Sequence, residues 1–314
     1  GWENIELISD RPFDLWLDEF SALKDSHPDR PIIASIMEEY SRDAWHEIVE
    51  RTQSTGVDGL ELNFSCPHGL PERRMGSAMG QDPDVLAEVC GWVMEAARVP
   101  VWAKLTPNVT RIEDPAAAAL RAGCHGVSAI NTILCVMGVN LDTLRPEPTV
   151  EGYSVAGGYS SKAVRPIALR MTMELATMMF GGGAGAPLPN NGAPANPPRF
   201  PDRFLSAIGG IETGEDAAQF ILLGAHTAQV CTGVMKHGYG LIHTLRRGLE
   251  TFMNRHAFET IEEFRGRSLR YFTTHAELVR LQREARGDRD DRRPANDSQW
   301  DDVRVVDQSE SLAR

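Results

Sequence analysis

The 314-residue sequence has few cysteines and no pattern that pairs them. Its five cysteines are widely scattered, at positions 66, 90, 124, 135 and 231. No two of them form a C-x-x-C motif, which excludes a recognisable zinc site or iron–sulfur cluster, and we expect no metal site. An odd, scattered set of cysteines also gives no disulfide framework, so we expect a reducing compartment and place the protein in the cytoplasm.

The sequence is also short of positive charge and of long apolar runs. Lysine and arginine number 32 against 44 aspartate and glutamate residues, a formal net charge of −12. Nucleic acids and anionic membranes bind basic faces, so we expect neither as a partner. No apolar run approaches the roughly 20 residues that span a bilayer. The polar first residues, Gly1 to Asn4, also lack the apolar segment of a signal peptide.

From residue 31 onward, short apolar runs alternate with stretches of helical periodicity. Six runs are typical of buried parallel strands, at 31–37, 59–63, 99–105, 126–131, 204–209 and 227–231. Ser41, Asp114 and Thr213 are suited to cap three of the intervening helices. Six βα units predict a (β/α) barrel or a doubly wound sheet. A closed barrel needs eight strands, so either the sheet is open or two units are missing, and we favour the second.

Three segments depart from this alternation. A long glycine-rich connection covers 133–163. Residues 181–198 are rich in Gly, Pro, Ala and Asn and join a helix to the next strand, so we expect them on the amino-terminal face of the barrel, away from an active site. Dense mixed charge near the end of the chain predicts a flexible tail. We therefore divide the chain into a catalytic domain, 1–272, and a charged, partly disordered tail, 273–314.

Polar residues lie where the predicted strands end, the position at which parallel βα folds carry their function. They are Asn63, Cys66, Lys104, Asn131, Thr132, Gly209, Gly210, Cys231 and Thr232. Each of these residues could also be present for a structural reason and have no role in function. A lone cysteine is most often an inert buried residue, and a strand-end lysine can snorkel to the rim. The asparagines could tether loops or hold a ligand, and the Gly-Gly pair could make a tight turn or bind phosphate through its N–H groups.

Longer motifs resemble one known family. They lie at 63–69 (Asn-Phe-Ser-Cys-Pro-His-Gly), 75–83, 103–108, 129–132, 162–170, 209–213 and 229–233. Together, from about residue 4 to 272, they resemble the dihydropyrimidine dehydrogenases, and most of all the catalytic subunit of the bacterial two-subunit enzymes. The related dihydroorotate dehydrogenases share Asn-x-Ser-Cys-Pro and the strand-end lysine, but match less well around Pro107-Asn108 and Asn131-Thr132.

The resemblance implies a (β/α)8 TIM barrel with FMN at the carboxyl ends of the strands. It implies that Cys66 is the general acid that protonates uracil or thymine. The residues implied to hold the pyrimidine are Asn4, Glu6, Asn63, Asn131 and Thr132. Those implied to hold FMN are Lys104, Ser160, Gly209, Gly210, Cys231 and Thr232. The resemblance also implies an oligomer, with a partner subunit that carries FAD, iron–sulfur clusters and the NAD(P) site.

The sequence departs from the family pattern in three ways. The two strands that open the family barrel are absent, so we expect an N-terminally incomplete chain. Ser161 stands where the family usually has glycine, which matters if the backbone there needs a positive φ. Some relatives carry a C-terminal ferredoxin-like domain with cysteine clusters, but no cysteine follows Cys231 here, so we expect electrons to come from a partner subunit or a different donor. Three other functions stay open: a dihydroorotate dehydrogenase, a flavin-free barrel lyase that uses Lys104 as a Schiff base, and a non-catalytic remnant.

Overall fold

The computed structural model describes residues 1–5, 9, 11–66, 74–181 and 199–286. Glu6 and the glycine-rich segment 182–198 lie outside the described residues. The chain divides into two units, Gly1–Phe272 and Thr273–Arg314. The second unit contains helix α10 (His275–Arg286), which lies at the start of the expected tail.

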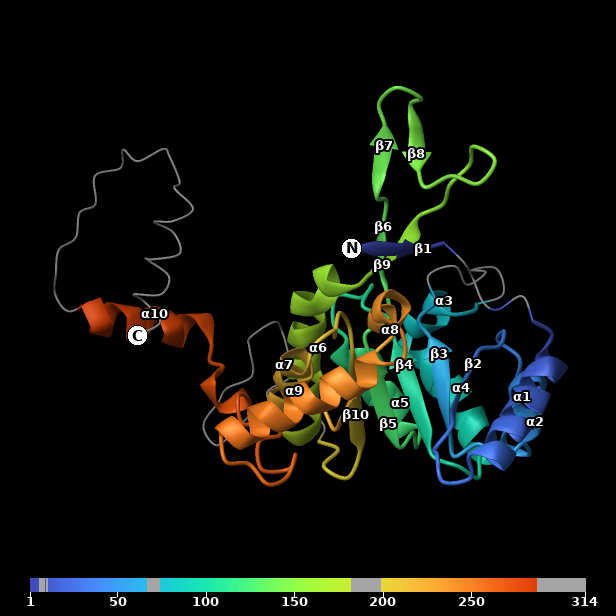
Figure 1. The fold of residues 1–314 in the computed structure, drawn as a ribbon, viewed down its shortest axis with the longest axis horizontal. Helices are drawn as coiled ribbons and strands as arrows, with labels where there is room; N and C mark the ends of the chain where they lie inside the picture. The colour runs from blue at the N-terminus through green and yellow to red at the C-terminus, as the bar shows by residue number, and fades with distance from the viewer. Residues whose placement is uncertain (6–8, 10, 67–73, 182–198, 287–314) are drawn as a thin grey trace. The chain divides into compact units, whose positions relative to one another are not determined.

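A parallel sheet of six strands forms the centre of the first unit (Figure 1). The strands are β2 (Ile33–Ile36), β3 (Gly59–Phe64), β4 (Val101–Leu105), β5 (Gly126–Ala129), β10 (Phe204–Ile208) and β11 (Thr227–Gln229). All six predicted strands are confirmed, with ends within about two residues of the expected ones. The strands lie side by side in the order in which they occur along the chain.

Alternation of side chains gives each strand two faces, as β3 illustrates. Leu60, Leu62 and Phe64 are fully buried under the helices, and the Phe64 ring lies 5.9 Å from the ring of Trp45 on α2 (Arg42–Gln53). Glu61, from the alternate set, points to the inside of the curled sheet and bonds to a strand on its far side. The alternation of apolar and polar residues along β3 thus decides which side chains pack under the helices and which point to the inside of the curled sheet.

Helices cover the outer face of the sheet in sequence order. Each packs against the next: α2, α4 (Pro83–Ala96), α5 (Glu113–Arg121), α6 (Arg165–Phe180) and α7 (Gly214–Leu222). A doubly wound sheet would reverse its strand order at a switch point, and this one does not. The fold is therefore six βα units of a TIM-type barrel, a half-barrel whose two edge strands are β11 and β2.

The caps of the helices follow from local sequence, with one correction. Ser41 accepts a hydrogen bond from the Ala44 N–H, and Thr213 forms a reciprocal capping box with Asp216. The predicted cap at Asp114 is wrong, because α5 begins one residue earlier, at Glu113. Asp114 instead lies in the first turn, where its charge is favourable beside the helix dipole.

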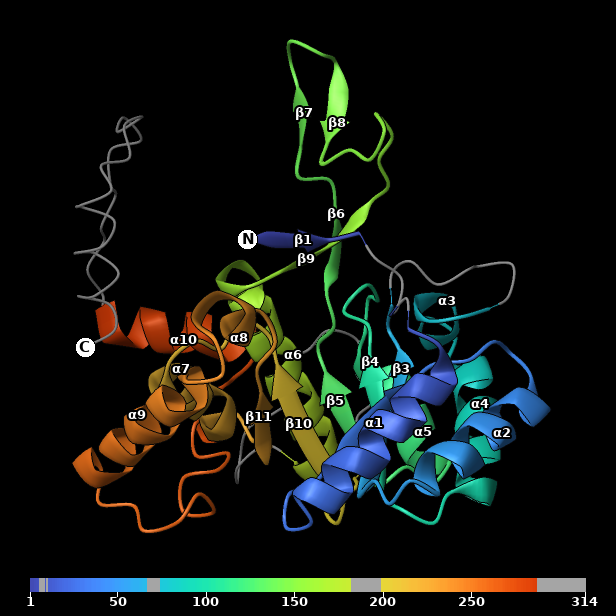
Figure 2. The same cartoon turned by 45° about the vertical axis from the view of Figure 1, so that its right-hand side comes forward.

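The connection 133–163 is more structured than the sequence predicted. Its strand β9 (Gly157–Ser160) pairs antiparallel with β6 (Ile133–Cys135) on one side and with β1 (Trp2–Asn4) on the other. A second hairpin, β7 (Gly138–Asn140) and β8 (Arg145–Glu147), extends away from the barrel (Figures 1 and 2). Pairing with β9 brings the first residues of the chain to the carboxyl ends of the barrel strands.

The remaining elements complete the unit. They are α1 (Phe13–Ser26), α3 (Ser77–Gly80), α8 (Thr232–His237), α9 (Leu241–Arg255) and the short helices η2 (Lys162–Val164) and η3 (Leu269–Tyr271). Within the described ranges, no helix has the length and apolar character needed to cross a membrane.

Candidate active site

A cavity of about 590 Å³ opens at the carboxyl ends of the barrel strands. Its walls come from the ends of β4, β5, β10 and β11 and from the β1–β9 pair above them. Nine of the twelve residues singled out from the sequence line it: Asn4, Lys104, Asn131, Thr132, Ser160, Gly209, Gly210, Cys231 and Thr232. Parallel strands bring their carboxyl ends to one edge, which explains why residues far apart in sequence meet here.

The wall that follows β5 is held by a main-chain hydrogen bond and by the side chain of Asn108. The Asn131 N–H donates to the Leu105 carbonyl at 3.2 Å, and the Asn108 side chain bridges the next turn, donating to the Thr132 carbonyl and accepting from the Leu134 N–H at 2.9 Å. Asn108 was not among the predicted site residues, although it lies in the quoted 103–108 motif. Its role here is to position the Thr132 segment.

Among the residues that the structure describes, two polar atoms at this cavity have no hydrogen-bond partner. Thr132 Oγ1 and Glu3 Oε2 are both buried, and their residues line the cavity. An unsatisfied buried polar atom in a native protein is costly, so such atoms tend to mark a site that a ligand or water completes. Glu3 was missed by the sequence reasoning, because nothing in Gly1 to Asn4 predicted that β1 would pair with β9.

The opposite end of the cavity is a tight backbone cradle. Gly209 and Gly210 have φ values of +144° and +74°. A Cβ on Gly210 would lie 2.7 Å from the Ser161 carbonyl oxygen, so only glycine allows the two loops to approach this closely. Ser161 itself has φ +74°. The backbone at this position thus has a positive φ, and serine adopts it where glycine would be unstrained.

Basic side chains surround this cradle and converge on one carboxylate. Glu212 lies 2.7 Å from Lys236 Nζ, 3.2 Å from His237 Nε2 and 3.5 Å from Lys162 Nζ. Burial raises the pKa of Glu212, but the bonds from Lys236 and His237 and the charge of Lys162 outweigh it and lower the pKa to about 2. Two lysines against one carboxylate leave net positive charge here, which suits an anionic group. The sequence reasoning missed this cluster, because its members are far apart along the chain.

Asn63 is the next-to-last residue of β3, and Cys66 lies two residues beyond the end of that strand. Asn63 pairs in register with Lys104 on the neighbouring strand. Its Oδ1 accepts bonds from the Ser65 N–H and hydroxyl at 3.2 and 2.9 Å, so its carbonyl tethers the loop. Cys66 is buried, 4% exposed, and forms no disulfide with the described cysteines, and its carbonyl accepts from the Ser77 N–H. The loop that continues from Cys66, 67–73, lies outside the described residues.

A sequence profile of the dihydroorotate dehydrogenase family matches residues 11–181, more than half of the chain. The chain belongs to this family. It is 56% identical to the chloroplastic dihydropyrimidine dehydrogenase (NADP(+)) of Arabidopsis thaliana, over 99% of the chain and 70% of that protein. It is 37% identical to the NAD-dependent dihydropyrimidine dehydrogenase subunit PreA of Escherichia coli, over 85% of the chain and 60% of that subunit.

Identity is lower to a dihydroorotate dehydrogenase itself. The catalytic subunit of dihydroorotate dehydrogenase B from Pyrococcus abyssi is 33% identical, over 68% of the chain and 62% of the relative. Within this family of oxidoreductases, the chain therefore groups with the dihydropyrimidine dehydrogenases. The chain spans 60% to 70% of the length of these relatives.

The family membership and the geometry weigh against a flavin-free lyase. A Schiff-base lysine must reach the carbonyl carbon of its substrate with Nζ. Lys104 Nζ lies 3.4 Å from the Glu61 carboxylate, in an ion pair whose side chains are 18% and 10% exposed. Among the described residues, no group of three or more His, Cys, Asp or Glu side chains is arranged to hold a metal ion.

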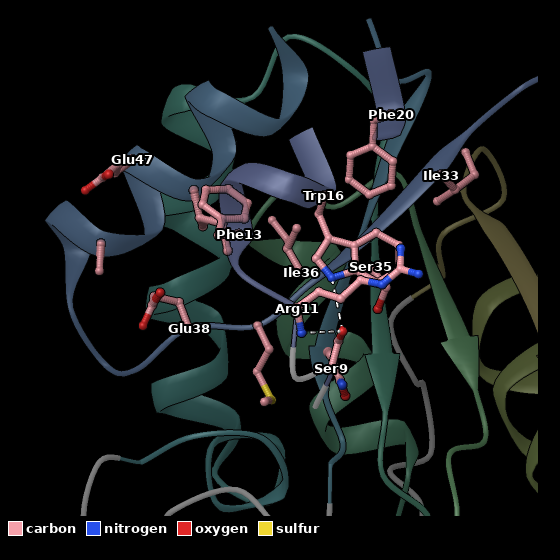
Figure 3. A pocket seen from close by; sticks show the side chains of 14 residues that line it. Ser9, Arg11, Phe13, Trp16, Phe20, Ile33, Ser35, Ile36, Glu38 and Glu47 are labelled. Atoms are coloured by element: carbon pink, nitrogen blue, oxygen red, sulfur yellow. Dashed lines mark hydrogen bonds between the residues drawn. The ribbon is translucent and has the colours of Figure 1, made fainter. Parts of the chain in front are cut away.

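A second cavity, of about 670 Å³, lies beside the edge strand β2 (Figure 3). Phe13, Trp16 and Phe20 of α1 line it, together with Ile33 of β2, and the Trp16 indole donates to Ser9 Oγ at 3.2 Å. Asn63 lines this cavity rather than the first one. The cavity adjoins the open edge of the half-barrel, where a closed barrel of this family type would continue with another strand. We assign no ligand to it.

Proposed function

We propose that the chain binds FMN in the 590 Å³ cavity and reduces uracil or thymine to the 5,6-dihydropyrimidine. The observation that carries the proposal is the convergence of nine of the twelve predicted site residues on one cavity, in a chain 56% identical to a dihydropyrimidine dehydrogenase. The residues present suit a flavin nucleotide. The cradle and its basic surroundings suit a phosphate, and Lys104 suits the negative charge that a reduced flavin ring carries.

The cofactor would be held by residues from several elements. Ser160, Gly209, Gly210, Cys231 and Thr232 would bind it through hydroxyl and main-chain groups, with Lys104 beside its ring system. Bound flavin supplies the hydride chemistry in such enzymes. The chain would supply orientation and a fixed positive charge, which favours negative charge developing nearby in a site shielded from water.

The pyrimidine would be held by amide, carboxylate and hydroxyl side chains, those of Asn4, Glu6, Asn63, Asn131 and Thr132. Amides can donate to the ring oxygens and accept from the ring N–H groups. In Asn63, the carbonyl is engaged by Ser65 and the Nδ2 amide group is the donor that it can offer. Hydride addition at C6 leaves negative charge on C5 and the C4 oxygen. We propose that the Cys66 thiol donates the proton that C5 takes up, since free thiols are largely protonated at neutral pH.

The electrons would reach this chain from a partner subunit. The described residues contain no G-x-G-x-x-G turn between a strand and a helix, the usual mark of a nicotinamide dinucleotide site. We propose a partner that carries FAD, iron–sulfur clusters and the NAD(P) site, in an oligomeric enzyme. The proposal is supported by the E. coli relative, which is named as one subunit of an NAD-dependent dihydropyrimidine dehydrogenase.

We keep the cytoplasm as the proposed compartment. None of the five cysteines, all of which lie in the described residues, forms a disulfide, as expected in a reducing environment. The plant relative is named as chloroplastic. The compartment is tested by determining where the intact protein is found in the cell.

The proposal is tested by one half-reaction that needs no partner. Purified full-length protein should show a flavin absorption spectrum. After chemical reduction under nitrogen, the flavin should be reoxidised by uracil or thymine. The oxidised protein should not be bleached by dihydroorotate. Absence of flavin, or bleaching by dihydroorotate with no response to uracil and thymine, would contradict the proposed function.

A further inference from the structure

The interior of the half-barrel is polar, which is unusual for this architecture. Barrel interiors are typically filled by layers of bulky branched apolar side chains. Here the inward positions of four strands form a hydrogen-bonded set below the cavity, the floor network: Glu61, Ser128, Ser206, Thr227 and Gln229. Polar groups in such a place cost free energy unless they are satisfied, so their presence calls for a functional reason.

Glu61 lies at the centre of the floor network. Its Oε1 accepts a bond from Gln229 Nε2 at 2.8 Å, and its Oε2 lies 3.4 Å from Lys104 Nζ. The same amide nitrogen of Gln229 also lies 2.9 Å from Ser206 Oγ. Glu61 is 8% exposed and is not among the residues that line the cavity, whereas Lys104 and Gln229 both line it. The Glu61 carboxylate therefore contacts Lys104 and Gln229, two residues that line the cavity, from the side that faces away from it.

This geometry matters most for Lys104. A lysine head group is a compact charge on a flexible four-carbon stem. Electrostatic stabilisation depends on charges that are held in place before the reaction begins. Glu61, fixed on the neighbouring strand β3, restricts where the Lys104 ammonium can lie.

We propose that Glu61 is a positioning residue, whose buried carboxylate fixes the Lys104 ammonium at the floor of the cavity, under the flavin ring. The inference rests on the proposed function in one respect, that the cavity holds a flavin. Glu61 acts through Lys104 and does not touch the substrate. A merely structural Glu61 would only tie β3 to β11 through Gln229.

The experiment is a double-mutant cycle between Glu61→Gln and Lys104→Met in the flavin-loaded full-length protein. Glutamine keeps the size of the side chain and an oxygen for Gln229, but it removes the charge that holds Lys104. The readout is the two-electron reduction potential of the bound flavin, measured by equilibration with a reference dye. We expect Glu61→Gln to lower the affinity for reduced relative to oxidised flavin about tenfold, a shift of ~30 mV to lower potential. In the Lys104→Met background it should change the potential little.

Two further variants separate positioning from structure. Thr227→Val removes a hydroxyl that bonds Ser206 at the far end of the floor network, and should leave the potential unchanged. Glu61→Asp keeps the charge but withdraws it by one methylene group, and should also lower the potential. It therefore keeps the test valid if Glu61→Gln fails to fold.

Each outcome decides for or against the inference. An unchanged or raised potential in the Glu61 variants, or an equal shift with and without Lys104, would overturn it. Because the potential needs no substrate, a protein that holds flavin but reduces no pyrimidine would refute the proposed function alone. An active enzyme with an unshifted Glu61→Gln potential would refute only the role of Glu61. A protein that binds no flavin would refute both.

Discussion

The Gln229 amide nitrogen lies 2.8 Å from the Glu61 carboxylate, although their strands β11 and β3 are four places apart in the sheet. In a flat sheet, four strand spacings would separate them by roughly 19 Å. The contact is possible only because the sheet curls on itself as a barrel does. The same curl brings the ends of β4, β5, β10 and β11 around one cavity. The bond between Gln229 and Glu61 is therefore a direct sign of the curvature that forms the site.

Replacing Cys66 with alanine should abolish pyrimidine reduction and leave flavin bound. The thiol is the proposed proton donor, and general acids typically contribute about 10²–10⁴-fold to the rate. The measurement is reoxidation of the reduced flavin by uracil, with the flavin content determined from its absorption. Cys90→Ala is the control, because Cys90 is a fully buried thiol on α4, and it should retain turnover. Activity of Cys66→Ala within a few-fold of wild type would exclude Cys66 as the donor.

Ser161→Gly should be more stable than Ser161→Ala, by about 1–2 kcal/mol in the free energy of unfolding. Both variants lose the hydroxyl that lies 3.4 Å from Glu212 Oε1, so they differ only in the Cβ atom. At φ +74°, that Cβ is strained in alanine and absent in glycine. Urea unfolding of the two variants measures the difference. Equal stabilities, or a more stable alanine variant, would show that the left-handed backbone is not adopted.

The Glu212 cluster should stabilise the protein at neutral pH and lose its effect in acid. The folded pKa of Glu212, about 2, is below its ordinary value of 4.5. For a lowered pKa, the stabilisation is fully present above the unfolded value and disappears as the pH falls from 4.5 through 2. We expect wild type to exceed Glu212→Gln by about 1–3 kcal/mol at pH 7, in protein without flavin, and by progressively less below pH 4.5.

The control for that experiment is Glu215→Gln. Glu215 is an exposed carboxylate, 3.7 Å from Arg255 on the same side of the barrel, and its ion pair is open to solvent. Exposed pairs contribute little, so its removal should leave the pH dependence as in wild type. A pH-independent difference between wild type and Glu212→Gln would show that the cluster is not held by ionised Glu212.

Local signals explain what could be predicted from the sequence. Run 59–63 alternates apolar residues with Glu61 and Asn63, and run 99–105 is apolar except for Lys104. The Thr213–Asp216 capping box is set by residues three apart, so strands and helix starts follow from short windows. The sequential strand order follows from the βα alternation. In a parallel sheet, residues at the carboxyl ends of the strands lie at the same edge of the sheet, however many residues separate them in the sequence. This is why Lys104 and Gly209 could be expected in one cavity.

Long-range contacts explain what the sequence alone did not reveal. The pairing of Glu3 in β1 with Tyr159 in β9 joins the start of the chain to residues more than 150 positions away, and neither strand has a strong apolar pattern. The floor network is equally non-local, since Glu61 meets Gln229 only once the sheet has curled. The Asp114 cap was wrong because a helix start competes with neighbouring residues, and Glu113 can also begin the first turn.

Deleting residues 183–196 should hardly affect activity. The segment itself lies outside the described residues, but its flanks are already in contact: the Phe200 N–H donates to the Met179 carbonyl at 2.7 Å. A short link can therefore close the gap without moving α6 or β10. Those flanks lie at the amino end of β10, whereas the cavity lies at its carboxyl end. The measurement is kcat for uracil reduction together with the melting temperature, and a large loss of kcat with the melting temperature preserved would contradict this placement.

Reduction of the bound flavin by NADH or NADPH should require a second subunit. The cavity has no described dinucleotide-binding turn, and the substrate side of the flavin would be occupied by the pyrimidine, so a nicotinamide has no evident docking place beside the flavin. The test mixes the flavin-loaded full-length protein with either nucleotide under nitrogen and follows the loss of flavin absorption in the visible band. We expect slow or no bleaching alone, and rapid bleaching once a co-purified flavin and iron–sulfur subunit is added. Rapid bleaching without any partner would show that the chain carries its own nicotinamide site, and the proposed route of electrons through a partner would then be wrong.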